Sequence, residues 1–197
     1  MSRHEFVVST ILDIKSKSEL FHSQIIFATV TLQVAGAKMP IACTFRLNGE
    51  PTSILRCEGV GDFAAFSGDG KGKDNPKATA IRDVGPLPPG RYYIVDRGSG
   101  GLFSHLIDFF RAHVYGTDRS KWFALYHADT SNDWVFVNGV KRGNFRLHPH
   151  GPRNLSQGCI TLVDPVAFER LSRSLKSASQ MTIPGSKGFA YGTIDVK

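Results

Sequence analysis

The sequence predicts a mainly β fold, a β-rich α+β domain with about two helices. Short β-branched and aromatic runs alternate apolar with polar residues, Gly, Pro and Asn turns separate these runs, and only two segments have a helical period. A chain of 197 residues is long enough for one domain plus a modest extension. Its 41% hydrophobic and 21% charged residues exclude a disordered chain.

Composition also limits the partners of the protein. No run approaches the roughly 20 apolar residues of a membrane span, and the N-terminus lacks the uninterrupted apolar core of a signal peptide. Neither membrane insertion nor a classical signal peptide is therefore expected. The net charge of +7 fits solubility alone or an anionic partner. Nucleic acid is not expected, because no zinc-finger spacing, RNA-binding signature or phosphate-binding loop accompanies the charge.

The chain divides into an N-terminal extension of unknown role, residues 1–40, and a main domain, residues 41–197. The extension contains a β-branched run at 25–32 that predicts a strand. Asn48-Gly49 favours a tight turn and so predicts a hairpin in the main domain. The segments of the main domain predicted as strands are the hairpin 44–55, then 92–95, 121–127, 134–138, 141–148, 159–162 and 189–196.

Two helices are predicted. Apolar residues at three- to four-residue spacing predict the first over 102–114. The second begins after Asp164, which suits the N-cap position, with Pro165 at the first helical position. Its expected apolar stripe consists of Phe168, Leu171, Leu175 and Ala178.

The segment 145–162 carries the strongest chemical signal. Polar and apolar residues alternate up to His148, so Arg146 and His148 are expected on the face away from the core. The alternation resumes at Cys159, whose side chain is expected on the same face. If the two strands are neighbours, His148 at the end of one lies near Cys159 at the start of the next.

An imidazole beside a thiol can activate it, because the thiolate is the nucleophile and a free thiol is only slightly ionised at neutral pH. We therefore predict Cys159 as nucleophile and His148 as base. Gly158 permits backbone conformations closed to other residues, and the N–H groups of Gly158 and Cys159 can then point at an oxyanion. Ser156 can hydrogen-bond within the loop or to substrate. Without further pattern, a buried cysteine and a surface histidine would be the commoner explanation of such a pair. The alternation on both flanks and the Ser-x-Gly-Cys context favour a functional pair.

Other polar residues are candidate substrate ligands. Arg142, Arg146 and Lys141 can hold carboxylates, since arginine binds them bidentately, although a solvated basic strand face is the alternative. Tyr126 and His127 end another strand, where they can line a cleft or pack in the core.

The cysteines and histidines allow two further interpretations. Cys43 and Cys57 flank the predicted hairpin turn, so they can form a disulfide in an oxidising compartment, or be two small buried residues. Four residues would suit a zinc site, but no acidic residue adjoins them and a proline interrupts the strand that carries two of them, so no metal is predicted. These four residues are His127, His148, His150 and Cys159.

The segment HPHGPRNLSQGCITL resembles the active-site signature of L,D-transpeptidases, in which a His precedes Ser/Thr-x-Gly-Cys and a hydrophobic strand. The spacing of eleven positions from His148 to Cys159 is similar to that of type VI secretion L,D-transpeptidase effectors and shorter than in housekeeping enzymes. The segment AAFSGDGKGKDNPKATAIRDVGPLPPGRYYIVD also resembles this effector family. The resemblance covers residues 42–196 and implies an L,D-transpeptidase-like β-sandwich or barrel.

The resemblance implies a cysteine enzyme that acts on the tetrapeptide stems of bacterial peptidoglycan and needs no cofactor. Cys159 would attack the carbonyl of the third stem residue and expel the terminal D-alanine, with His148 as base and then acid. Water would complete an L,D-carboxypeptidase reaction, and an amine would complete exchange or cross-linking. The carbonyl of Pro149 is implied as the third member of the dyad, and His150 stays open as an alternative base.

The substrate lies outside the cytoplasm, so the resemblance implies delivery by a type VI secretion machine into the periplasm of a target bacterium. Residues 1–40 would then serve in secretion or docking, and a cognate immunity protein would protect the producer. Two alternatives from other classes stay open, namely a zinc-dependent peptidase and a non-catalytic binder of anionic cell-wall polymer.

Overall fold

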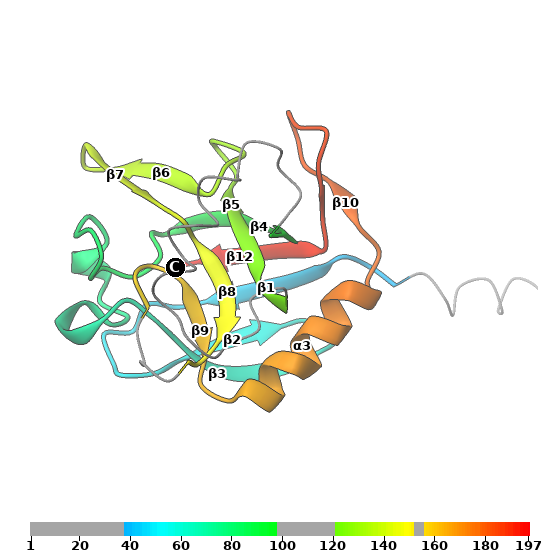
Figure 1. Ribbon diagram of the computed structural model, residues 1–197, viewed down its shortest axis with the longest axis horizontal. Coiled ribbons are helices and arrows are strands. Elements are labelled where there is room, and N and C mark those ends of the chain that lie inside the picture. The colour runs from blue at the N-terminus through cyan, green and yellow to red at the C-terminus, as the bar shows by residue number, and fades with distance from the viewer. Residues whose placement is uncertain (1–37, 98–120, 152–155) are drawn as a thin grey trace, which may run out of the picture. The chain divides into compact units, whose positions relative to one another are not determined.

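The computed structural model describes residues 38–97, 121–151 and 156–197. Within these residues, strands close into a barrel in the order β1-β12-β4-β5-β8-β9-β3-β2 (Figure 1). This confirms the mainly β prediction. The barrel strands are β1 (Ile41–Phe45), β2 (Ser53–Cys57), β3 (Gly61–Ser67), β4 (Gly90–Asp96), β5 (Phe123–His127), β8 (Arg146–Pro149), β9 (Ile160–Leu162) and β12 (Gly192–Val196).

Smaller elements extend from the barrel. The strands β6 (Trp134–Val137) and β7 (Val140–Gly143) form one two-stranded sheet, and β10 (Met181–Thr182) and β11 (Phe189–Ala190) form another. Two short 3-10 turns, η1 (Gly70–Gly72) and η2 (Pro76–Ala78), lie in the connection between β3 and β4. The helix α3 spans Pro165–Ser177 and follows β9 (Figure 1). No helix of the described residues has the length and hydrophobicity to cross a membrane.

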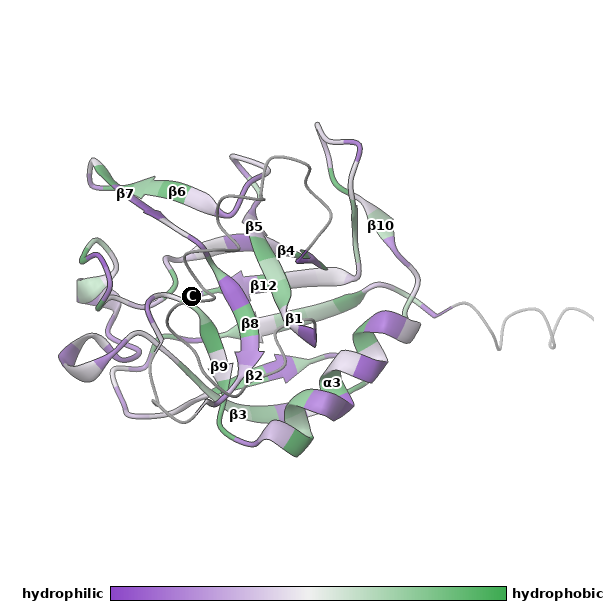
Figure 2. Ribbon diagram, in the orientation of Figure 1, coloured by the Kyte–Doolittle hydropathy of each residue, from purple (hydrophilic) through white to green (hydrophobic). Residues whose placement is uncertain are grey.

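The hydrophobic core fills the inside of the barrel, because alternate residues of each strand point inward. In β1 and β2 buried and exposed positions alternate strictly. The helix α3 adds the apolar stripe predicted for it, with Phe168, Leu171 and Leu175 buried in the same core. Figure 2 shows hydrophilic and hydrophobic residues interspersed along α3, as expected of an amphipathic helix. Each such fully buried side chain stabilises the fold by roughly 1.5–3 kcal/mol.

The start of α3 follows the sequence prediction. The side chain of Asp164 accepts a hydrogen bond from the Val166 N–H at 2.8 Å, and Pro165 occupies the first helical turn. The predicted helix 102–114 and the predicted strand 25–32 lie outside the described residues, as does most of the extension 1–40.

Two predicted strands are each divided in the structure. The segment 141–148 was expected to be one strand, but Asn144 has a φ of +62° and turns the chain between β7 and β8. Asparagine tolerates this left-handed conformation better than most residues. Because the chain turns at Asn144, β7 pairs with β6 in a separate hairpin, while β8 enters the barrel. The C-terminal segment 189–196 is likewise divided, into β11 and β12.

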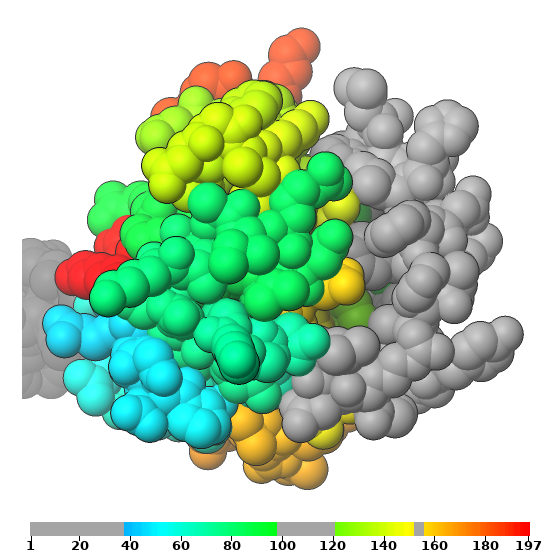
Figure 3. All heavy atoms as spheres, turned by 90° about the vertical axis from the view of Figure 1, so that its left-hand side faces the viewer, coloured from blue at the N-terminus to red at the C-terminus, as the bar shows by residue number. Residues whose placement is uncertain are grey.

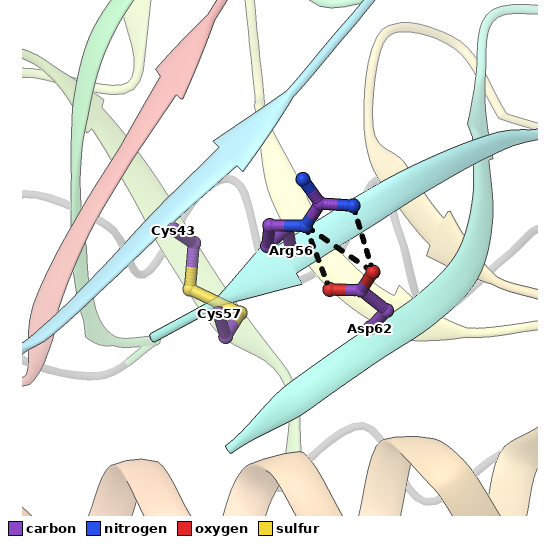
Figure 4. The surroundings of a disulfide bond; sticks show 4 residues. All are labelled: Cys43, Arg56, Cys57 and Asp62. Atoms are coloured by element: carbon purple, nitrogen blue, oxygen red, sulfur yellow. Dashed lines mark hydrogen bonds and ion pairs between the residues drawn. A yellow bond between two sulfur atoms is a disulfide. The ribbon is translucent and has the colours of Figure 1, made fainter. Parts of the chain in front are cut away.

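The hairpin of β1 and β2 carries a disulfide. Cys43 lies directly opposite Cys57 in the antiparallel register, both side chains are buried, and their sulfur atoms are bonded (Figure 4). The turn between the strands contains Gly49 with a φ of +75°, as the Asn-Gly signal predicts. The structure thus confirms the disulfide and leaves Cys159 as the free cysteine.

Loss of this disulfide should destabilise the fold by about 3 kcal/mol, because the bond closes a loop with a sequence separation of 14. For a chain of this size the midpoint of thermal unfolding should fall by roughly 6–12 °C. Thermal unfolding of the Cys43→Ala/Cys57→Ala variant beside the wild type measures the effect. Thiol titration of unreduced, denatured wild type should find one free thiol, and three free thiols would contradict the assignment.

Candidate active site

His148 lies on β8, and Cys159 directly precedes β9, the neighbouring strand of the barrel. β8 and β9 run parallel, with Leu147 opposite Ile160 and His148 opposite Thr161. Leu147 and Ile160 point into the core, so His148 and Cys159 share the outer face of the barrel. Standard strand spacings put their Cα atoms about 8 Å apart, diagonally across the strand pair. The predicted neighbourhood of the two strands is therefore present.

The imidazole of His148 is fixed from several sides. Its Nδ1 lies 2.8 Å from the carbonyl oxygen of Pro149, an acceptor, so Nδ1 carries the proton and donates it. Nε2 is then unprotonated and lies 3.3 Å from the hydroxyl of Thr161. The ring stacks on Trp122, with 4.3 Å between centroids. Burial lowers the pKa of His148 to about 4, so the ring is neutral at physiological pH.

The thiol of Cys159 is buried next to the backbone of the β7–β8 turn. Its Sγ lies 3.7 Å from the carbonyl oxygen of Asn144, to which the thiol donates. The backbone of Arg146, one step before the Leu147–Ile160 pair, favours the ionised form of the same sulfur and acts to lower its pKa. Burial raises the pKa of Cys159 to about 11, so the resting group is a neutral thiol. Both members of the pair are thus uncharged before any substrate binds.

The turn before Cys159 is held by two of the residues that the sequence singled out. Ser156 donates from its hydroxyl to the Cys159 carbonyl at 2.7 Å and accepts from the Gly68 N–H at 3.3 Å. Gly158 has a φ of +104°, the left-handed region that glycine adopts readily. A Cβ there would also lie 2.8 Å from the guanidinium of Arg142. The expected special backbone conformation at Gly158 is confirmed, and Ser156 bonds within the loop.

The alternative of a solvated basic strand face is wrong for Arg142 and Arg146, because both side chains are buried. Arg142 donates to backbone carbonyls of the β3–β4 connection, those of Thr79, Gly85 and Pro86. Figure 3 shows this connection packed directly against the β6–β7 hairpin that carries Arg142. Arg146 forms a buried ion pair with Asp133 at 2.7 Å. Both guanidiniums thus bind groups of the protein, and a role as substrate ligands stays a prediction.

Lys141 is exposed on β7, and its ammonium lies 4.4 Å from the centre of the Trp134 ring. This cation–π contact accounts for its position on the hairpin. Tyr126 is half-buried on the outer face of β5, and the charges of Asp133 and Arg146 act on its hydroxyl. It therefore borders the same group of polar residues as Cys159.

His127 is separated from His148. It lies five positions beyond Trp122, the residue stacked on His148, which corresponds to about 16 Å along the strand. Its ring is buried edge-on against Tyr92. His150 donates its backbone N–H to Leu162 and places its ring near Phe66.

This separation does not support the zinc alternative. No three His, Cys, Asp or Glu side chains of the described residues come together in a way that could hold a metal ion.

Sequence reasoning missed four residues that surround the dyad. Thr161 could have been found from its position two residues after Cys159, because both then share a strand face. Trp122 and Asp133 lie far away in the sequence and carry no local signal, and Asn144 contributes a backbone carbonyl that any residue would supply. The four are Trp122, Asp133, Asn144 and Thr161.

The fold and the site together define a barrel domain whose outer face carries a buried cysteine and a neutral histidine at the ends of two neighbouring strands. Residues 61–186 match the family model of the Tlde1 domain, which stands for type VI secretion L,D-transpeptidase effector 1. The chain belongs to this family. The match confirms the resemblance found in the sequence and places the protein among type VI effectors that target peptidoglycan. No curated protein and no solved structure matched the chain.

Proposed function

We propose that the protein is a cysteine L,D-transpeptidase or L,D-carboxypeptidase that acts on peptidoglycan tetrapeptide stems through Cys159 and His148. The observation that carries this proposal is the hydrogen bond from His148 Nδ1 to the Pro149 carbonyl. It leaves Nε2 unprotonated, so that Nε2 can take up a proton once the Thr161 hydroxyl turns away. His148 and Cys159 lie on the same face of the neighbouring strands β8 and β9, with Cys159 at the start of β9. A base needs this tautomer to activate a thiol.

In the proposed reaction the thiol turns from the Asn144 carbonyl toward Nε2 of His148. Because thiol and imidazole are both neutral at rest, proton transfer accompanies attack on the carbonyl of the third stem residue. The backbone N–H groups of Gly158 and Cys159 are proposed to stabilise the oxyanion of the tetrahedral intermediate. The imidazolium then protonates the leaving amine of D-alanine, and a thioester remains on Cys159.

The second half of the reaction decides the product. Water attacking the thioester gives a tripeptide stem, which is carboxypeptidase activity, and a D-amino acid or a neighbouring stem gives exchange or cross-linking. In either case His148 removes the proton from the attacking group, since it returns to its neutral form after the first step. The disulfide Cys43–Cys57 supports action in an oxidising compartment such as the periplasm of the target cell.

Mass spectrometry of disaccharide-tetrapeptide fragments tests the proposal. Incubation with the wild type should remove one alanine, and added D-amino acid should replace that alanine if exchange occurs. Intact fragments after incubation with folded wild type would contradict the substrate assignment. The same fragments that lack the terminal D-alanine are the control, because they offer no bond to cleave between the third and fourth residues.

The proposed role of His148 predicts an unusual pH dependence. The pKa of His148 is about 4, so the base should stay neutral through the whole neutral and mildly acidic range. Turnover should therefore be flat from about pH 5 to pH 7 and fall below pH 4, where protonated His148 can no longer accept the thiol proton. Initial rates of D-alanine release in overlapping buffers measure this, and an acid limb centred near 6.5 would contradict a desolvated base.

A further inference from the structure

The strongest charges near Cys159 come from a buried ion pair. Arg146 and Asp133 meet at 2.7 Å, and both side chains are almost completely shielded from solvent. Arg146 precedes Leu147 on β8 just as Cys159 precedes Ile160, the residue paired with Leu147, and its guanidinium and backbone both act on the sulfur. The pair therefore lies on the outer face of the barrel, next to the sulfur and away from the apolar core.

Several charged or titratable groups face Cys159 from the surrounding elements. Arg146 and the neutral His148 lie on β8, Arg142 lies on β7, and Asp133 lies in the turn before β6. The two guanidiniums favour the thiolate, and the carboxylate of Asp133 disfavours it. Because the imidazole is uncharged at rest, the positive charge beside the sulfur comes from arginine.

We propose that the Arg146–Asp133 pair sets the reactivity of Cys159, with Arg146 stabilising the thiolate and Asp133 restraining that stabilisation. Both are positioning residues, since they act on the sulfur without contacting substrate. The proposal rests on the proposed function only in naming Cys159 as the reactive group. An ion pair that served stability alone would show no preference between thiol and thiolate, so opposite effects of its two charges are the distinguishing sign.

The disulfide makes a direct test feasible. The chain has three cysteines, and the bond between Cys43 and Cys57 leaves Cys159 as the thiol that a reagent can modify. The rate of alkylation by iodoacetamide at pH 8, followed by intact mass in the unreduced protein, then reports on Cys159 alone. No substrate is needed, so the result is independent of whether the enzyme cleaves stem peptides.

Asp133→Asn should speed alkylation and Arg146→Gln should slow it, each by about threefold to tenfold. The alkylation rate should change less than the thiolate fraction, because the thiolate of a more acidic thiol is a weaker nucleophile. The double variant should return toward the wild-type rate, because its neutral side chains remove both charges. Rates over pH 7 to 10 should shift along the pH axis in the same opposite directions.

The chain offers a matched control in the ion pair of Arg56 and Asp62, which is exposed on β2 and β3 (Figure 4). Arg56→Gln and Asp62→Asn should leave the rate unchanged. If Asp133→Asn and Arg146→Gln change the alkylation rate in the same direction, the change reflects access to the thiol, and the proposal is overturned. If Arg146→Gln does not fold, Asp133→Asn decides alone, and an unchanged or slower rate in that variant refutes the proposal.

Discussion

Replacing Cys159 by alanine should reduce release of D-alanine from tetrapeptide fragments to the uncatalysed background. The expected effect is the largest of any single substitution, because the proposed thioester cannot form without the sulfur. Cys159→Ser should also be close to background, since a hydroxyl is much less acidic than a thiol. Mass spectrometry of the released fragments measures both variants, and a thioester trapped on the wild type by acid quench would identify the attachment point.

The fold of these variants can be checked independently. Cys159 is not part of the disulfide, so Cys43–Cys57 should form normally and thermal unfolding should stay within a few degrees of the wild type. Turnover at the wild-type rate by folded Cys159→Ala would exclude a cysteine mechanism. The zinc content and polymer binding of the protein would then be the next measurements.

Replacing His148 by alanine should lower turnover by about 10²- to 10⁴-fold, the usual contribution of a general base. The binding of fragments should change less, because the proposed role of His148 is proton transfer. The measurement is kcat and KM for D-alanine release. His148→Gln is a useful second variant. The glutamine amide can still donate to the Pro149 carbonyl, but it has no basic ring nitrogen that could take up a proton.

His150→Ala is the matched control for His148. It removes an imidazole two positions further along, whose backbone bonds to Leu162 and whose ring lies near Phe66. Turnover within about threefold of the wild type is expected. A larger loss in His150→Ala than in His148→Ala would reverse the assignment of the base and revive the alternative that the sequence left open.

Local patterns were enough to predict much of this fold. Strand alternation gave the core-facing Leu147 and Ile160, and the same alternation placed His148 and Cys159 on the opposite face. The N-cap at Asp164 and the turn at Gly49 follow from short-range chemistry that the sequence carries directly. These features need no knowledge of distant residues.

The errors arise where distant parts of the chain meet. Arg142 and Arg146 look like solvent-facing residues from alternation, but the β3–β4 connection and Asp133 cover them. Sequence periodicity shows which face of a strand a residue occupies, and not what packs on that face. The division of 141–148 was missed for a related reason, because a left-handed Asn144 matters only once β7 and β8 have different partners.

The parallel pairing of β1 with β12 has a consequence for the order of assembly. Ile41 lies opposite Gly192, so the contact joins residues separated by 192 − 41 = 151 positions. The hairpin of β1 and β2 is local and can form early. The other side of β1 stays unpaired until β12, from the far end of the domain, joins the sheet. Such long-range closure is slow, and an unpaired edge is a template for pairing with other chains. The interval before β12 arrives is therefore when this domain is most exposed to aggregation.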